Sequence, residues 1–208
     1  MSGEGDNEDL SIKDLRTKCI ALLSLALMLR PSDIAPHGVH YDSQTHTTRA
    51  MVFSTDCLDF QSNGALSVTL FGTKTDSDRA GFLVLLPPHT VAKLDPVAAL
   101  ACYIRRTARD RCVLRKPLFL SLVRPFKALS AAQVSSVLND AIVAAGLAGL
   151  GFSAKYFRPT GATHAVSTGV DPEIIRKMGR WKTSQVFYDH YVHTVTPQLN
   201  TTATIGAV

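Results

Sequence analysis

The chain has 208 residues, 46% of them hydrophobic, with four cysteines and a formal net charge of +5 at pH 7. This length can bury a core without disulfides, the cysteines form no Cys-x-x-Cys pair, and the longest apolar run, residues 19–29, is too short to cross a bilayer. These properties argue against a disulfide-stapled secreted domain, a metal site and a membrane span, so we expect a soluble intracellular protein.

The charge is unevenly placed along the chain. Residues 1–72 hold 5 Lys and Arg against 9 Asp and Glu, whereas residues 73–208 hold 17 against 8. Such asymmetry indicates a polyanionic partner. A basic run such as residues 105–111 is, however, also typical of a solvated helix face, so charge alone does not identify nucleic acid as the partner.

The N-terminal part of the chain is predicted to be a tail followed by helices. Residues 1–10 are acidic and polar, and we expect them to be disordered because they have little to bury. From Ser11, a suitable N-cap, apolar residues recur at helical spacing as far as Arg30. Pro31 suits the first turn of a short second helix over residues 31–35.

Three β-like runs follow, at residues 50–55, 66–71 and 81–87. They are separated by turn-rich stretches, one of which contains Asn63-Gly64 and the other of which spans residues 72–81. These short connections predict a small three-stranded antiparallel sheet.

The chain is predicted to be helical from Pro96 onward. Polar residues suited to capping open the expected helices, which lie near residues 95–112, 130–145, 153–168, 171–179 and 183–192. The uncharged segment 194–208 is expected to be a flexible tail. The fold class is therefore mainly α with one small antiparallel sheet, in a single domain over residues 11–193.

Several polar residues fall at the borders of these elements. Each one has an ordinary structural explanation: an arginine that ends a helix complements the helix dipole, a lysine in a turn is solvated, and a helical tyrosine is commonly packed. Together they form an ordered pattern, which comprises Arg30, Lys74, Lys155, Arg158, Arg180, Trp181, Tyr188 and Tyr191.

The pattern resembles the catalytic domain of the tyrosine recombinases, the phage-integrase-like family that also includes transposon-borne enzymes. The stretch "ALLSLALMLRPSDIA" resembles the helix that carries the first catalytic arginine and an acid three residues later, here Arg30 and Asp33. The stretch "LSVTLFGTKTDSDRAGFLVLLPP" resembles the β-hairpin of the catalytic lysine, here Lys74.

The stretch "KYFRPTGATHAVSTGVDPEIIRKMGRW" resembles the family's second arginine box, His-x-x-Arg followed by a Gly-His or Gly-x-Trp element. The resemblance implies that Arg158 is the second catalytic arginine. Lys155 stands where the family usually has histidine. Trp181 is preferred at the third position, with Arg180 as an unusual neighbour, although a lone tryptophan is equally a core anchor.

The segment "FYDHYV" resembles the part of the family that carries the tyrosine nucleophile. Tyr191 is one residue further from Trp181 than in the family's common pattern, whereas Tyr188 is two residues too close. Tyr191 is therefore preferred as the nucleophile, and Tyr188 remains the alternative. The resemblance extends over about residues 12–193.

The resemblance implies an enzyme that cuts and rejoins double-stranded DNA through a 3′-phosphotyrosyl intermediate, without a cofactor. We expect a homo-oligomer on DNA, in the nucleus or the nucleoid, and no membrane or small-molecule partner. The family's N-terminal core-binding domain has no counterpart in this sequence, so weak DNA affinity is expected. Lys155 and the displaced tyrosine leave open an inactive DNA-binding or scaffold descendant, and an unrelated helical protein is the third possibility.

Overall fold

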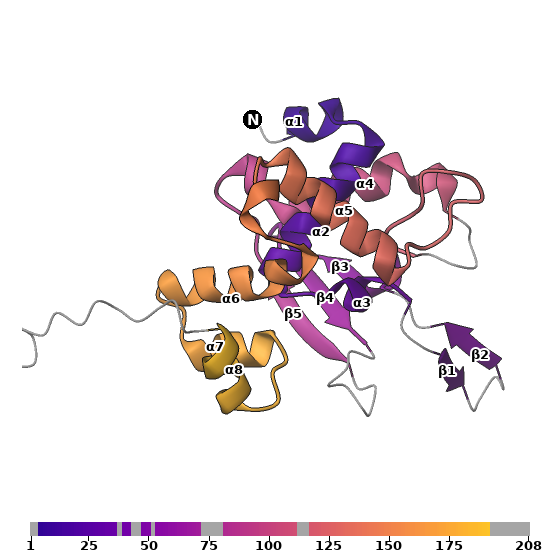
Figure 1. Cartoon of the computed structure of the whole chain (residues 1–208). Helices are drawn as coiled ribbons and strands as arrows, with labels where there is room; N and C mark the ends of the chain where they lie inside the picture. The colour runs from indigo at the N-terminus through magenta and orange to yellow at the C-terminus, as the bar shows by residue number, and fades with distance from the viewer. Residues whose placement is uncertain are drawn as a thin grey trace, which may run out of the picture.

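The computed structural model describes residues 4–36, 39–42, 47–50, 53–71, 81–111 and 117–191. Most of this part of the chain is helical (Figure 1). The helices are α1 (Glu4–Asp9), α2 (Ile12–Ala26), α3 (Pro31–Ile34), α4 (Pro96–Arg106), α5 (Ala131–Ala144), α6 (Phe157–Ser167), α7 (Pro172–Met178) and α8 (Ser184–Tyr191). The strands are β1 (Val39–Asp42), β2 (Thr47–Ala50), β3 (Leu58–Phe60), β4 (Leu66–Leu70) and β5 (Phe82–Leu86).

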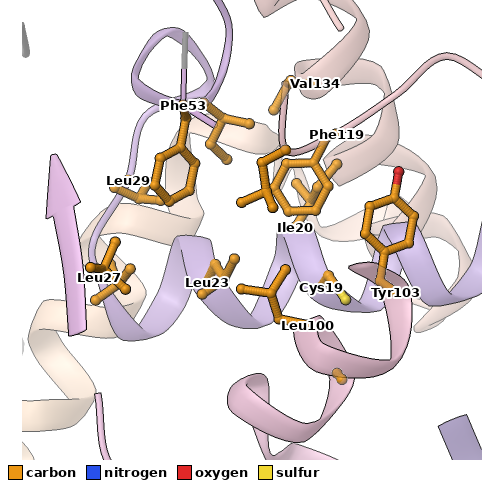
Figure 2. Packing of buried hydrophobic residues seen from close by; sticks show 14 of the residues in the cluster. Cys19, Ile20, Leu23, Leu27, Leu29, Phe53, Leu100, Tyr103, Phe119 and Val134 are labelled. Carbon is orange, nitrogen blue, oxygen red and sulfur yellow. The ribbon is translucent and has the colours of Figure 1, made fainter. Parts of the chain in front are cut away.

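Helix α2 is the central element of the core. The side chain of Ser11 accepts a hydrogen bond from the backbone N–H of Asp14, as expected of an N-cap. Apolar side chains at helical spacing then make α2 buried along its length, and it packs against α4, α5 and α6. Figure 2 shows this core, in which α2 meets Leu100 and Tyr103 of α4 and Val134 of α5.

The three-stranded sheet has the order β3-β4-β5 and is antiparallel throughout. Strands β4 and β5 confirm the predicted runs at residues 66–71 and 81–87. The first predicted run, at residues 50–55, does not supply the third strand of this sheet: Ala50 ends β2, residues 51–52 lie outside the described residues, and a 3₁₀ turn begins at Thr55. The turn at Gly64, whose φ is 83°, pairs β4 with the segment just before it, which is β3. Phe53 instead packs in the core, and its carbonyl accepts from the N–H of Leu118.

Helix α1 lies where the sequence suggested a disordered tail. Its polar residues have little to bury, but its C-terminal end meets the basic end of α4. The guanidinium of Arg106 donates to the carbonyls of Asn7, Glu8 and Leu10, and Arg105 pairs with the Glu8 carboxylate. Cations that satisfy the last carbonyls of a helix stabilise it, which explains why this part of the prediction fails.

The caps of the later helices largely confirm the prediction. Asp95, Ser130 and Asp171 each accept a hydrogen bond from a backbone N–H in the first turn of α4, α5 and α7. The helix expected from residue 153 begins instead as a 3₁₀ turn, Ala154–Tyr156, before α6. Gly161 of α6 lies so close to the backbone of α2 that a Cβ at this position would collide with the Leu25 carbonyl. This close approach places the start of α6 beside the end of α2.

The expected C-terminal tail, residues 194–208, and the predicted site residue Lys74 lie outside the described residues. Among the residues that are described, no helix combines the length and the apolar character that crossing a bilayer requires.

Candidate active site

The turn between α2 and α3 positions Arg30. After α2 ends, Met28 takes a left-handed conformation with φ 51°, which is uncommon for a residue other than glycine. Arg30 is the N-cap of α3, and Pro31 follows it at the first helical position. The backbone N–H of Arg30 donates to Oδ2 of Asp33 over 2.9 Å. The acid three residues after the arginine therefore holds the backbone from which the Arg30 side chain projects.

Arg158, near the start of α6, reaches this turn from the other half of the chain. Its side chain is buried, with 4% of the residue exposed. Nη1 donates to the Met28 carbonyl over 2.6 Å, and Nη2 donates to the Gly179 carbonyl. The Met28 carbonyl is only two residues from Arg30, so the two arginines that the sequence singled out lie in one neighbourhood.

Arg180 and Asp33 form a buried ion pair in the same neighbourhood. Nη2 of Arg180 is 3.4 Å from Oδ2 of Asp33, and each side chain is 4% exposed. Burial lowers the pKa of Arg180, while the Asp33 carboxylate raises it and the positive charge of Arg30 lowers it. Arg180 also has a left-handed backbone, with φ 60°. Strained residues gather at functional sites, and here Met28 and Arg180 lie in contact.

Trp181 is a packing residue. It is 5% exposed and belongs to an apolar cluster of Met28, Ala162, Ile175, Trp181 and Phe187. Its ring lies 5.0 Å from that of Phe187 in α8, and the Arg158 guanidinium lies 4.2 Å from its centre. This packing is what the anchor alternative predicts, and the ring lies against the Arg158 guanidinium.

Lys155 lies one turn before Arg158 and is exposed. Its Nζ is 5.3 Å from the centre of the Tyr156 ring, which is itself partly exposed. Lys155 is thus near Arg158 in the chain, but its side chain is turned towards Tyr156, outside the buried group formed by Asp33, Arg158, Arg180 and Trp181.

Helix α8 carries both candidate tyrosines. Phe187 is fully buried against Trp181, whereas the neighbouring Tyr188 is 41% exposed and packs edge-on against Phe187 at 5.3 Å between centroids. The backbone of Tyr191 forms the last described residue of α8.

Solved structures share this arrangement of elements. The structure titled XerH site-specific recombinase bound to difH substrate, a pre-cleavage complex, is 12% identical, with a TM-score of 0.65 over 98% of this chain and 51% of that chain. The post-cleavage complex of the same recombinase with palindromic difH substrate gives the same identity and TM-score, covering 50% of that chain. The chain has the fold of a tyrosine recombinase catalytic domain.

A transposon enzyme is also similar to this chain. The Tn1549 transposon integrase (aa 82-397), in complex with circular intermediate DNA, is 12% identical, with a TM-score of 0.54 over 99% of this chain and 62% of that chain. This chain thus spans about half to three fifths of the length of these neighbours. Neither a family model nor a curated protein matches the sequence.

Sequence reasoning missed parts of this recombinase-fold site. The Met28 carbonyl, which accepts from two arginines, has no sequence signal, because a left-handed methionine is not predictable from local preference. The pairing of Asp33 with Arg180 joins residues 147 positions apart. Gly161 could have been found, since a glycine inside a helix often marks a close approach to another backbone.

Proposed function

We propose that this chain is the catalytic domain of a site-specific DNA recombinase or integrase. The observation that carries the proposal is the hydrogen bond from Arg158 to the Met28 carbonyl, which spans 130 residues and brings the second predicted arginine to the turn that holds the first. The fold in which this occurs is shared with recombinases whose structures contain DNA. The proposal assigns residues 11–193 to the catalytic domain and double-stranded DNA to its substrate.

The proposed reaction is a transesterification at a DNA phosphodiester. The phenol oxygen of Tyr191 attacks the phosphorus and gives up its proton to water, the bond to the 5′ oxygen breaks, and a 3′-phosphotyrosyl bond forms. Because the phosphodiester energy is retained in that bond, the cut strand can be rejoined without an external energy source. We assign protonation of the leaving 5′ oxygen to Lys74, on the basis of the sequence pattern.

Arg30 and Arg158 are proposed to stabilise the transition state. Attack creates a pentavalent phosphorus with added negative charge on its non-bridging oxygens, and guanidinium groups match such oxygens with paired N–H donors. A donor that is held in place before the reaction contributes most, because it needs no rearrangement as charge develops. The contacts of Arg158 with two carbonyls and with the Trp181 ring supply such a fixed position.

Lys155 is proposed to contact a DNA phosphate near the scissile one. It is exposed, it lies one turn before Arg158, and it stands at the family's histidine position. A lysine retains the positive charge of the interaction but is a poorer proton acceptor than histidine. Its contribution would then be electrostatic.

A second candidate function is DNA binding without chemistry. Two features favour it: lysine replaces histidine at position 155, and Trp181 is buried in an apolar cluster. Such a descendant would keep the fold and the basic residues, bind duplex DNA, and fail to form a covalent bond to it.

One experiment distinguishes the two functions. The protein is incubated with a suicide duplex, nicked beside the cleavage position so that the cleaved strand diffuses away, and the products are separated by denaturing electrophoresis. Since the target is unidentified, a pool of random-sequence nicked duplexes serves as the probe. We expect a covalent protein–DNA band that protease removes. Binding in a gel-shift assay without any covalent band would support the second candidate instead.

A further inference from the structure

Arg180 occupies the centre of the buried hydrogen-bond network at the candidate site. It lies in the turn between α7 and α8, and its guanidinium points inward to the end of α2. Besides the ion pair with Asp33, it donates to the carbonyls of Met178 over 3.2 Å, Met28 over 3.4 Å and Leu27 over 3.5 Å. Together with the ion pair to Asp33, these contacts use the charge of Arg180 inside the protein.

Two acceptors connect Arg180 to the two predicted catalytic arginines. Oδ2 of Asp33 accepts both from Nη2 of Arg180 and from the backbone N–H of Arg30. The Met28 carbonyl accepts both from Nη2 of Arg180 and from Nη1 of Arg158. A single side chain thus shares one acceptor with Arg30 and another with Arg158.

We propose that Arg180 is a positioning residue that acts through Asp33 on Arg30, and that it does not bind the DNA phosphate. The inference rests on the proposed function. A buried carboxylate is strongly attracted to a guanidinium in ion-pair distance, so Arg180 sets the orientation of Asp33. Asp33 in turn fixes the backbone of Arg30, and catalytic groups lose effectiveness steeply when they are displaced by about 1 Å.

The planar shape of arginine is essential to this role. A lysine at position 180 would keep the positive charge but has one compact ammonium group, which cannot reach Asp33 and several carbonyls in different directions. Arg180→Lys is therefore the informative variant, because it preserves the buried charge balance while removing the geometry. Asp33→Asn is its partner variant, because it retains the shape of the carboxylate and removes its charge.

The test is a double-mutant cycle on the rate of covalent adduct formation, measured with saturating suicide duplex in a single turnover. We expect Arg180→Lys and Asp33→Asn each to slow the reaction about 10- to 100-fold. The double variant should be no slower than the slower single variant, because both changes interrupt one connection. The dissociation constant for duplex DNA should stay within about twofold of the wild type.

A second cycle tests whether the connection ends at Arg30. In an Arg30→Lys background, Arg180→Lys should slow adduct formation by less than about threefold, since the residue that it positions is already lost. A merely structural role for Arg180 would give the same loss in both backgrounds.

Arg16→Lys is the matched control. Arg16 is also a buried arginine whose pKa is lowered by burial, and it donates to the Leu120 carbonyl over 2.8 Å, away from the candidate site. This variant should reduce thermal stability and leave the adduct rate per folded molecule unchanged. A rate loss as large as that of Arg180→Lys would show that destabilisation explains both and would overturn the inference.

Two further outcomes overturn the proposal. The first is a double variant whose rate loss equals the product of the losses in Arg180→Lys and Asp33→Asn. A weakened DNA affinity with a shallower salt dependence in Arg180→Lys has the same meaning. Either result would indicate that Arg180 is an independent phosphate ligand. Absence of an adduct from the wild type would instead remove the proposed function, and with it any reaction for Arg180 to assist. The wild-type protein alone tests the proposed function, and the variants test the role of Arg180, so failure of one is distinguishable from failure of the other.

Discussion

The carbonyl of Met28 shows how much one backbone group can organise. It accepts hydrogen bonds from both Arg158 and Arg180, and the left-handed backbone of Met28 orients the carbonyl towards them. Such a conformation costs of order 1–3 kcal/mol, so it persists only where its surroundings compensate for it. Here the compensation comes from charge-assisted hydrogen bonds, which are stronger than neutral ones.

The first residue-scale prediction concerns Arg158. Arg158→Lys should slow adduct formation by about 100- to 1,000-fold, the usual effect of losing one fixed oxyanion donor. It should also destabilise the fold, because a lysine cannot reach the Met28 and Gly179 carbonyls together while stacking on Trp181. Single-turnover cleavage and thermal melting measure the two effects. An unchanged rate would remove Arg158 from the phosphate clamp.

The second concerns the nucleophile. Tyr191→Phe should abolish the covalent adduct and leave DNA binding nearly unchanged, because it removes one oxygen and keeps the ring. Tyr188→Phe is the matched control on the same helix, since its partly exposed ring packs against Phe187 with or without the hydroxyl. An adduct that survives in Tyr191→Phe but disappears in Tyr188→Phe would reverse the assignment. Mixing Tyr191→Phe with Arg158→Lys protein tests whether the tyrosine serves a neighbouring protomer.

At the scale of elements, the attachment of α6 to α2 determines whether Arg158 can reach the Met28 turn. At Gly161, the backbone of α6 lies against the backbone of α2 at Leu25, where no Cβ fits. Helix α8 is attached differently, through the fully buried Phe187 on Trp181, while residues 184–186, 188 and 189 are exposed. A helix in close backbone contact with α2 therefore carries the arginine, and a helix attached through Phe187 carries the tyrosines.

Gly161→Ala tests the α2–α6 contact. We expect a loss of about 1–3 kcal/mol in the free energy of unfolding, typical of overpacking, although alanine is intrinsically the better helix former. The measurement is urea denaturation. Gly149→Ala is the control, since a Cβ at that glycine would meet nothing within 4 Å and its φ is not positive. Equal stability of the Gly161 variant and the wild type would contradict the close approach.

Phe187→Ala tests the attachment of α8. Removing a buried phenylalanine costs about 3–5 kcal/mol where neighbours cannot collapse into the space. Adduct formation should fall with it, because the helix that carries position 191 loses its packing on Trp181. The rate is compared with that of Val186→Ala, whose side chain is 46% exposed and whose loss should be nearly neutral. Equal rates in the two variants would contradict the anchoring role of Phe187.

The parts of this fold and site that could be predicted from the sequence are those that depend on interactions between residues close together in the chain. The caps at Ser11, Ser130 and Asp171 were predictable, because each bonds a backbone N–H within three residues. The segment that pairs with β4 was not, since strand pairing depends on the Gly64 turn and on the burial of Phe53 elsewhere. Arg158 was singled out only as one position in an ordered pattern.

Over the whole molecule, part of the uneven charge is paired within the protein. The acidic α1 pairs with the basic end of α4 through Glu8 and Arg105, at the end of the molecule away from α7 and α8 (Figure 1). The run at residues 105–111 is thus partly engaged within the protein, with Arg111 donating to the Leu118 carbonyl. The net positive charge of the second half of the chain therefore overstates the charge available to bind DNA, because some of these cations already interact with groups of the protein.

The last prediction uses this pairing to locate the DNA surface. Binding to duplex DNA should weaken steeply with salt, since released counterions drive phosphate contacts, with a slope of about −0.9 per contact in a plot of log K against log salt. Lys155→Gln should make that slope shallower by about 1, because it removes one exposed cation beside the candidate site. Arg105→Gln, an exposed cation paired with Glu8 where α1 meets α4, should leave it unchanged. Fluorescence anisotropy across a salt series gives all three slopes. If Arg105→Gln reduces the slope and Lys155→Gln does not, DNA lies against the α1–α4 end of the molecule, and the site around Arg30 and Arg158 is not where it binds.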